Sequence, residues 1–581
     1  MRRRDVLTSL AGAALAGIVP RGRARAADEH ALYDIGRFGN ARVLHITDTH
    51  AQLLPVYYRE PSVNVGVGAM AGRPPHLVGQ ALLNYLHIPP PGGRLAYAFT
   101  HLDFVEAARR YGRLGGFAHL KTLVDHLRAE AGAGRSLMLD GGDLMQGSAL
   151  ADIMRGADMV EAANLLGVDA MTGHWEFTHG EAQLRANIAR LKGDFLAQNV
   201  FLTEEAAFDN KPAFDQASGR VFKPSMIREL GEHRVGVIGQ AFPHVAIAHP
   251  KRFVPDWSFG IREAELQKLV DGLRENDKVD AVLLLSHNGM DLDLKLANRV
   301  RGIDAILGGH THDAVPSVVS VANAGGRTMV TNAGSAGKFL GVLDLDLDKG
   351  SVKGARYHLL PIFSDLLKPD AAMQALVERL RKPHTDGLGK EVAVAGDLLY
   401  RRGNFNGPMD QLVCDALRVM LDAEIAFSPG FRWGNTLMPR APITMEDVLG
   451  ETAISYPEVY VQSMTGAQIK AIMEDVCDNL FNPDPYYQQG GDMVRVGGLD
   501  YTCAPGNAMG QRISDLTLDD GRALDAGKTY RVAGWASVNP QQGKPAGELV
   551  ANFLRGEKVA RPKKLNRVTL KGVEGNPGVA E

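Results

Sequence analysis

The sequence predicts an α/β protein that is organised in two domains. Apolar runs of strand length alternate with patterns of helical period through residues 27–365, as in parallel sheets that are covered by helices. Five of these runs end in loops that carry Asp or His, which would gather at the carboxyl edge of such a sheet. The chain has 581 residues, too many for one typical domain.

The elements of the first domain follow from apolar periodicity. The candidate strands are Val43–Ile46, Leu137–Leu139, Ala170–Met171, Arg234–Gly239, Val279–Leu285, Ala305–Leu307, Met329–Asn332 and Leu340–Leu347. The candidate helices between them are Gly116–Glu130, Val160–Leu166 and Ile261–Asn276. Apolar and polar residues alternate along Leu340–Leu347, which predicts a strand with one buried face. A long insertion follows His50 and ends near Tyr111; it is either a surface excursion or a wall or docking surface at the site.

The sequence also indicates the boundaries of the signal peptide, the two domains, the linker and the tail. Residues 1–26 form a predicted signal peptide, and residues 27–365 form the first domain. Residues 366–385 are a linker with the helix Asp370–Lys382, residues 386–571 are a second domain, and residues 572–581 are a tail.

The N-terminus has the features of an export signal. Arg2-Arg3-Arg4 precedes a small apolar stretch, and Ala24-Arg25-Ala26 fits a cleavage site. The order Arg-Arg-x-Val-Leu resembles a twin-arginine signal, which predicts a periplasmic protein; an ordinary Sec signal is the alternative. Loss of residues 1–26, which contain six Arg and one Asp, would change the formal charge from −3 to about −8. We therefore expect no nucleic acid as a partner.

Composition indicates an ordinary globular protein, with 45% hydrophobic and 23% charged residues. No apolar run after the signal is long enough to span a membrane, so no membrane contact is expected after signal removal. The three cysteines, Cys414, Cys477 and Cys503, cannot form a disulfide framework in a chain of this length. We expect Cys414 and Cys477 to be core residues.

The loops at the strand ends contain the candidate metal-ligating residues. They contain Asp48-x-His50, Gly142-Asp143, Gly173-His174, Ser286-His287 and Gly309-His310-Thr311-His312. Carboxylate oxygen and imidazole nitrogen together suit divalent metals, and the neighbouring glycines let the backbone approach an ion closely. Five such loops predict a dinuclear metal centre.

The second domain contributes two glycine-rich loops, each with one arginine. Arg432 lies in the loop 428–434 and Arg495 in the loop 489–498. The planar guanidinium suits a tetrahedral oxyanion, although each arginine could equally serve in an ion pair.

These motifs, in this order, resemble those of the 5′-nucleotidase family of calcineurin-like metallophosphoesterases. The resemblance covers nearly the whole chain after the signal. It implies a four-layer αββα metallophosphoesterase domain, followed by a smaller α+β C-terminal domain of the 5′-nucleotidase type that binds substrate. It also implies two metals that share Asp143, one with Asp48, His50 and His312, and one with His174, His287 and His310.

The stretches Thr47–Pro55 and Gly173–Thr178 resemble those of one branch of the family, the thiosulfohydrolases of periplasmic sulfur oxidation. This resemblance implies two Mn²⁺ ions, with zinc or iron left open. It implies hydrolysis of S-sulfosulfanyl-L-cysteine on the SoxYZ carrier protein, whose cysteine sits on a mobile C-terminal arm. Water activated by the metals would release sulfate and leave a persulfide.

The site departs from the nucleotidase pattern beside His174. Nucleotidases have a His–Asp dyad at the positions of Trp175 and Thr178, which assists departure of an alkoxide. A persulfide is a better leaving group and needs no such acid. We expect Trp175 and Arg432 to act in catalysis, and Trp175, Arg432, Asp492, Arg495 and Tyr486 to contact the substrate. A plain packing role for Trp175 is the alternative.

Two other functions remain compatible with the sequence. One is a periplasmic 5′-nucleotidase or cyclic phosphodiesterase, which an aromatic pair that stacks on a base would favour. The other is a silent binding protein, which has no need of all seven candidate ligands.

Overall fold

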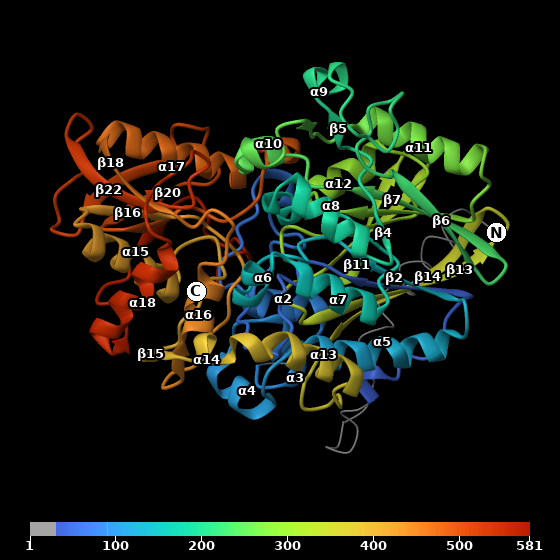
Figure 1. Cartoon of the computed structure of the whole chain (residues 1–581), viewed down its shortest axis with the longest axis horizontal. Coiled ribbons are helices and arrows are strands. Elements are labelled where there is room, and N and C mark those ends of the chain that lie inside the picture. The colour runs from blue at the N-terminus through green and yellow to red at the C-terminus, as the bar shows by residue number, and fades with distance from the viewer. Residues whose placement is uncertain (1–30, 90, 581) are drawn as a thin grey trace.

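The computed structural model describes residues 31–89 and 91–580 and contains two domains (Figure 1). The predicted signal 1–26 lies outside the described residues. In Figure 1 the C-terminal domain, orange to red, lies on the left, and the first domain occupies the centre and right. Over the described ranges, no helix combines the length and the apolar character needed to cross a membrane.

Within the described residues, the first domain contains two six-stranded sheets. In spatial order, the first comprises β14 (Ser351–Pro361), β13 (Phe339–Asp348), β1 (Ala41–Ile46), β2 (Ser136–Asp140), β3 (Ala170–Met171) and β4 (Asp194–Phe195). The second comprises β11 (Ala314–Asn323), β12 (Gly326–Ala333), β10 (Ala305–Gly308), β9 (Ala281–Ser286), β7 (His233–Gln240) and β6 (Ser225–Leu230). The runs β1–β2–β3–β4 and β12–β10–β9–β7 are parallel, so their carboxyl ends share one edge of each sheet.

Alternate side chains of each strand enter different cores, because the side-chain period of a strand is two. Val43 of β1 and Leu283 of β9 belong to the core between the sheets, whereas Leu44 and Leu284 belong to the two outer cores. The helices over the first sheet include α5 (Phe117–Ala131), α7 (Ala157–Leu166) and α13 (Ala371–Arg381); those over the second are α11 (Glu263–Glu275) and α12 (Met290–Arg299). The predicted αββα architecture is confirmed.

The prediction for Leu340–Leu347 was wrong in one respect. Both faces of β13 are buried from Phe339 to Leu345, because the strand lies between the second sheet and the helices. The polar residue Asp344 is buried through an ion pair with Arg42, whose Nε donates to Oδ1 at 2.6 Å. A polar position in an alternating pattern therefore marks a paired charge here rather than a solvated face.

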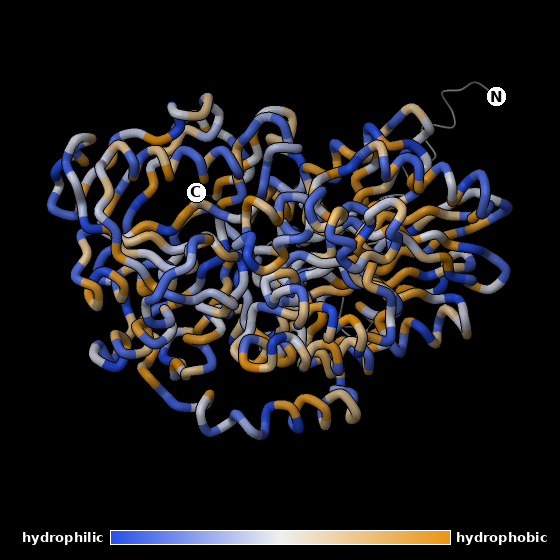
Figure 2. Tube along the Cα trace, turned by 45° about the horizontal axis from the view of Figure 1, so that its top comes forward, coloured by the Kyte–Doolittle hydropathy of each residue, from blue (hydrophilic) through white to orange (hydrophobic). Residues whose placement is uncertain are grey.

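The C-terminal domain is built of smaller sheets. Its four-stranded sheet has the order β18 (Val459–Thr465), β22 (Thr529–Trp535), β16 (Ile425–Ser428) and β19 (Arg495–Gly497). Two three-stranded sheets comprise β17 (Pro442–Thr444), β15 (Glu391–Ala395) and β23 (Val559–Ala560), and β21 (Ile513–Leu518), β20 (Leu499–Cys503) and β24 (Val568–Leu570). The main helices are α15 (Pro408–Leu421), α16 (Met445–Glu451), α17 (Gly466–Phe481) and α18 (Ala546–Glu557). Figure 2 shows mainly hydrophilic outer loops around more hydrophobic interior segments.

The insertion after His50 packs on the first domain and also contacts the C-terminal domain. It contains α2 (Gly79–Leu86), α3 (Arg94–Phe99) and α4 (Phe104–Tyr111). The Tyr58 hydroxyl donates to the backbone carbonyl of Arg432 at 2.6 Å, and Asn64 Nδ2 donates to Asp313 Oδ1 at 3.2 Å. Val63 also pairs with Val579 of the C-terminal tail. These contacts favour a wall beside the site over a free surface excursion.

Candidate metal centre

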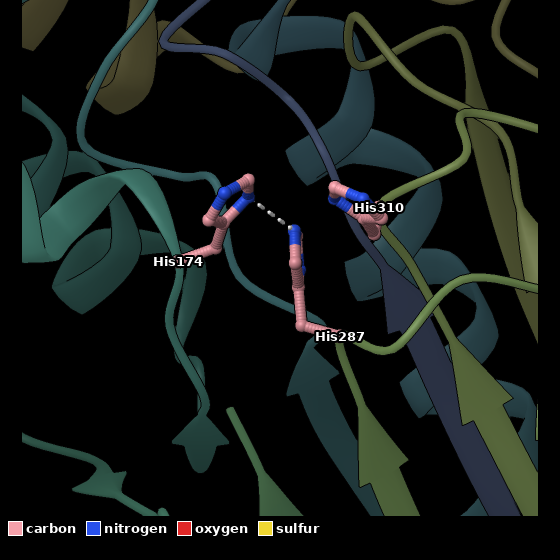
Figure 3. Close-up of side chains that lie close together, drawn as sticks. All are labelled: His174, His287 and His310. Carbon is pink, nitrogen blue, oxygen red and sulfur yellow. Dashed lines mark hydrogen bonds between the residues drawn. The ribbon is translucent and has the colours of Figure 1, made fainter. Parts of the chain in front are cut away.

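Seven side chains from five strand-end loops converge in two groups. Asp48 and His50 follow β1, Asp143 follows β2, His174 follows β3, His287 follows β9, and His310 and His312 follow β10. The donor atoms of Asp48, His50, Asp143 and His312 lie within 4.8 Å of one another, as do those of His174, His287 and His310. Figure 3 shows the three rings of the second group drawn together from separate loops.

Asp143 lies between the two groups. Its Oδ2 is 3.2 Å from His174 Nδ1, 3.1 Å from His287 Nε2 and 3.6 Å from His50 Nε2. Its Oδ1 accepts the backbone N–H of Trp175 at 2.8 Å. One carboxylate can therefore serve both groups, as a bridging ligand does.

The hydrogen bonds of the histidines indicate a cation between them. His287 Nδ1 donates to the carbonyl of Gly141 at 2.6 Å, which leaves Nε2 to coordinate once a metal has displaced its proton. His50 Nδ1 faces the carbonyl of Gln146 at 3.0 Å in the same way, while its Nε2 lies 3.0 Å from Nε2 of His312. These ring nitrogens face one another and also face two carboxylates. A positive charge between them would stabilise this arrangement. The donor set therefore fits two divalent metals, with backbone carbonyls that fix the tautomers.

The charges around His287 lead to the same conclusion. Burial lowers the pKa of His287, but the carboxylates of Asp143 and Asp48 outweigh it and raise the pKa to about 10. Burial opposes ionisation of Asp143, yet His174 and His287 hold its pKa well below the ordinary value. The site thus retains a positive charge, a proton or a metal ion, beside its carboxylates.

The backbone of the ligand loops is strained. Asp48, His50, Asp143, His310 and His312 all have positive φ, between 46° and 74°. Such conformations cost of the order of 1–3 kcal/mol each in a residue other than glycine and cluster at functional sites. A Cβ atom on Gly309 would lie 2.3 Å from Thr47 Oγ1 and 3.0 Å from Asp48 Oδ2, so only glycine fits there.

Glu176 organises two of the loops and was not among the predicted site residues. Its buried carboxylate accepts the backbone N–H groups of Leu144 at 2.7 Å, Met145 at 3.2 Å and His174 at 2.8 Å. It therefore fixes the loops of Asp143 and His174 relative to each other. Its position two residues after His174 was the only signal in the sequence.

A cavity of about 550 Å³ opens beside the second group of histidines and is walled by both domains. Its residues include Asp143, His174, Trp175, Phe242, His249, His310, His312, Phe431, Arg432, Trp433, Tyr456, Asp492 and Trp535. Trp175 has only 8% of its surface exposed and packs among residues of the C-terminal domain. It therefore lines the cavity and also takes part in the packing between domains.

Arg432 is presented to the cavity by the second domain. Its Nε donates to Asp492 Oδ1 at 3.2 Å, and Nη2 donates to the carbonyl of Gly491. Nη1 is buried and has no protein partner within the described residues. One N–H edge of this guanidinium is thus available to a ligand, while Asp492 holds the other.

Two other predicted contacts lie elsewhere, which corrects the expectation that they face the substrate. Arg495 is fully buried behind Asp492, and its Nη2 donates to Asp492 Oδ2 at 3.0 Å and to the carbonyl of Arg401 at 3.2 Å. Tyr486 donates to Glu263 Oε2 at 2.8 Å, beneath Lys295, and is not part of the cavity wall. The sequence of a loop shows that an arginine lies near glycines, but it does not show where the guanidinium points.

His249 and Trp433 line the cavity and were missed as site residues. Trp433 adjoins Arg432, so its loop offered a signal. His249 follows α10 (Val245–Ala248) and reaches the cavity only through tertiary packing. All three cysteines are buried, as expected for Cys414 and Cys477.

Two family models match the chain. The calcineurin-like phosphoesterase model matches residues 41–314, and the 5′-nucleotidase C-terminal domain model matches residues 396–542. Among curated proteins, the trifunctional nucleotide phosphoesterase YfkN of Bacillus subtilis is 28% identical over 75% of this chain and 31% of its own length. The rat 5′-nucleotidase is 28% identical over 52% of this chain and 54% of its own length. The chain thus spans about a third to a half of these relatives.

Solved structures match over nearly the full length. Sulfate thiohydrolase SoxB of Thermus thermophilus is 36% identical, with a TM-score of 0.86, over 93% of this chain and 98% of that one. A 5′-nucleotidase precursor, also of Thermus thermophilus, is 22% identical with a TM-score of 0.70, and shares the fold over 92% of this chain and 99% of that one. The chain therefore belongs to the 5′-nucleotidase family of calcineurin-like metallophosphoesterases, a superfamily of hydrolases, and within that family it fits SoxB.

Proposed function

We propose that the protein is a thiosulfohydrolase that releases sulfate from a cysteine-S-thiosulfonate, R–S–S–SO₃⁻. The proposal rests on one cavity, in which candidate metal-ligand histidines lie beside the indole of Trp175 and the Nη1 edge of Arg432, which has no partner in the described part of the chain. The likeness to the Thermus thermophilus sulfate thiohydrolase supports the same chemistry.

Asp48, His50, Asp143 and His312 would hold one metal, and His174, His287 and His310 the other, with Asp143 shared. We propose Mn²⁺ for both, although the mixed nitrogen and oxygen donors also suit zinc or iron. When bound, such a pair acidifies a water molecule and neutralises charge on the oxyanion.

The protein's own residues bind and orient the substrate. Arg432 donates from Nη1 to a sulfonate oxygen, and Asp492 holds the guanidinium plane in place. Trp175 offers an apolar, polarisable wall to the two sulfur atoms. Water adds to the sulfonate sulfur, the bond from that sulfur to the neighbouring sulfur breaks, and its electron pair leaves with the persulfide. The products are R–S–S⁻, sulfate and the two protons of the water, which pass to solvent, and there is no net oxidation or reduction.

The leaving group explains why the site needs no strong acid. Thiols ionise near pH ~8.5, and persulfides are more acidic, so the persulfide departs as an anion. Neither Trp175 nor Thr178 can donate a proton to an alkoxide, so hydrolysis of phosphate esters should be slow.

We also propose a partner protein and a cellular compartment. We propose SoxYZ as the partner, with its cysteine arm in the cavity between the domains. The order Arg3-Arg4-Asp5-Val6-Leu7 supports export of the folded protein to the periplasm by the twin-arginine pathway.

A nucleotidase function receives less support from the cavity. Phe431 and Trp433 stack directly on each other, with ring centroids 4.1 Å apart and an interplanar angle of 18°. A nucleotide base cannot enter between two rings at that separation.

The test measures sulfate release from a cysteine-S-thiosulfonate peptide and from the loaded carrier, with phosphate release from AMP in parallel. The same manganese-loaded preparation serves for all three, and Asp143→Ala is the blank. Sulfate without appreciable phosphate is expected. Phosphate without sulfate would refute the proposal and assign a nucleotidase.

A further inference from the structure

His249 stands in the cavity wall with both ring nitrogens unused. It caps the C-terminal end of α10, where its backbone N–H donates to the carbonyl of Val245 at 3.0 Å. The residue is only 3% exposed, yet Nδ1 and Nε2 have no partner within the described residues. In Figure 1, α10 lies where the first domain meets the C-terminal domain.

The ring is held by contacts that do not involve its nitrogens. The indole of Trp175 meets it edge-on at 4.3 Å, and the ring of His174 lies 4.8 Å away. A neutral imidazole carries one N–H donor and one acceptor. A buried donor without a partner is unfavourable, so a group that enters the cavity is expected to accept from it.

Like His249, Trp433 packs against Trp175. The two indole rings lie 4.9 Å apart, and Nε1 of Trp433 is likewise buried and unpaired within the described residues. Trp175 thus has two uncharged donors as neighbours, whereas Arg432 supplies the charged one. A guanidinium suits the fully charged sulfonate; an uncharged donor suits an atom whose negative charge develops only as a bond breaks.

We propose that His249 is a catalytic residue that donates an N–H hydrogen bond to the departing sulfur. This inference rests on the proposed thiosulfonate chemistry. As the bond between the sulfonate sulfur and its neighbour breaks, the electron pair stays on the neighbour and accepts from the imidazole. No proton is transferred, so the histidine remains neutral and the persulfide leaves as an anion.

The experiment compares His249→Phe with His249→Asn on cysteine-S-thiosulfonate peptide, using the full-length manganese-loaded protein. Phe removes the donor and keeps a ring, so kcat should fall about 10–100-fold with KM within about threefold, as for loss of one hydrogen bond to a charged group. Asn keeps an N–H donor and should recover a substantial part of kcat. His244→Phe, on the same segment but outside the cavity wall, is the matched control and should behave as wild type.

A second readout separates catalysis from packing. A cysteine-S-sulfonate peptide, R–S–SO₃⁻, loses a thiolate, which is more basic than a persulfide and needs the donor more. His249→Phe should therefore lose more activity on the S-sulfonate than on the S-thiosulfonate, while its metal content stays at two per chain.

Equal losses on both peptides, or unchanged kcat in His249→Phe, would overturn the role. So would loss of metal, which would make His249 a ligand. If wild type releases no sulfate, the proposed function itself fails, and that result is distinct from each of these.

Discussion

The two sides of the cavity are built in different ways. On the side of the first domain, seven candidate metal ligands stand at strand ends, and five of them have positive φ. On the side of the second domain, Arg432 stands on a glycine-rich loop and is oriented by the carboxylate of Asp492 and the carbonyl of Gly491. Under the proposed function, the strand-end side would hold the metals, and the loop side, with Trp175, would select the substrate. Changes on the two sides should therefore have different signatures.

The largest effect is expected from Asp143→Ala, since Asp143 faces both groups of donors. Turnover should fall by more than about 10³-fold, beyond the 10–100-fold that is typical for outer partners of metal ligands. Metal analysis should show that fewer than two ions are retained. Glu176→Gln, which alters only the support of the loops, should show the smaller loss; equal activity of Asp143→Ala and wild type would exclude the dinuclear site.

On the opposite side, Arg432→Ala should lower kcat for sulfate release by about 10²–10³-fold, as for loss of one oxyanion donor. Metal content should be unchanged, in contrast to Asp143→Ala. Arg432→Lys keeps the charge but not the planar fork, and should recover part of the rate. Wild-type kcat in a metal-loaded Arg432→Ala protein would show that the guanidinium does not contact the sulfonate.

Trp175 should decide which leaving group is tolerated. The double variant Trp175→His, Thr178→Asp restores an acid beside His174, and phosphate release from AMP should rise at least ~10-fold, part of the usual contribution of a general acid. Trp175→Phe removes the indole without adding an acid and is the control. If the ratio of phosphate to sulfate is the same in all three proteins, leaving-group selection lies elsewhere.

Metal binding should depend on pH through His287. The carboxylates of Asp143 and Asp48 overcome burial and raise its pKa to about 10, so a metal must displace a proton at pH ~8. Affinity should then rise roughly tenfold per pH unit up to that pKa. Without metal the sign is opposite: the protonated ring stabilises the fold below about pH 6.5, and this stabilisation is lost as pH rises towards about 10.

Titration calorimetry in buffers of different ionisation enthalpy counts the protons released on Mn²⁺ binding. At least one proton per chain is expected at pH ~8. Binding without proton release would mean that His287 is already neutral or is not a ligand.

The smallest effect is expected where the insertion meets Arg432. Tyr58→Phe removes the hydrogen bond to the carbonyl of Arg432 and should lower the free energy of unfolding by about 1 kcal/mol. Urea denaturation of metal-loaded protein measures this, and kcat should change by less than that of Arg432→Lys. A loss of activity as large as in Arg432→Ala would show that the insertion controls the loop.

The sequence predicted the metal side better than the substrate side, for a physical reason. Parallel strands bring their carboxyl ends to one edge, so Asp48, Asp143 and His287 could be placed together from local pattern alone. The direction of Arg495, in contrast, is set by Asp492 and Arg401, which contact it through packing that no local pattern encodes. His249 likewise reaches Trp175 from a separate segment.

The seven side chains of the two groups should hold two metals, with Asp143 between them. Anomalous diffraction at the manganese edge, from crystals of the loaded protein, tests it directly. Two peaks are predicted, one among Asp48, His50, Asp143 and His312, and one among Asp143, His174, His287 and His310. A single peak, or peaks away from Asp143, would contradict a dinuclear centre that shares Asp143.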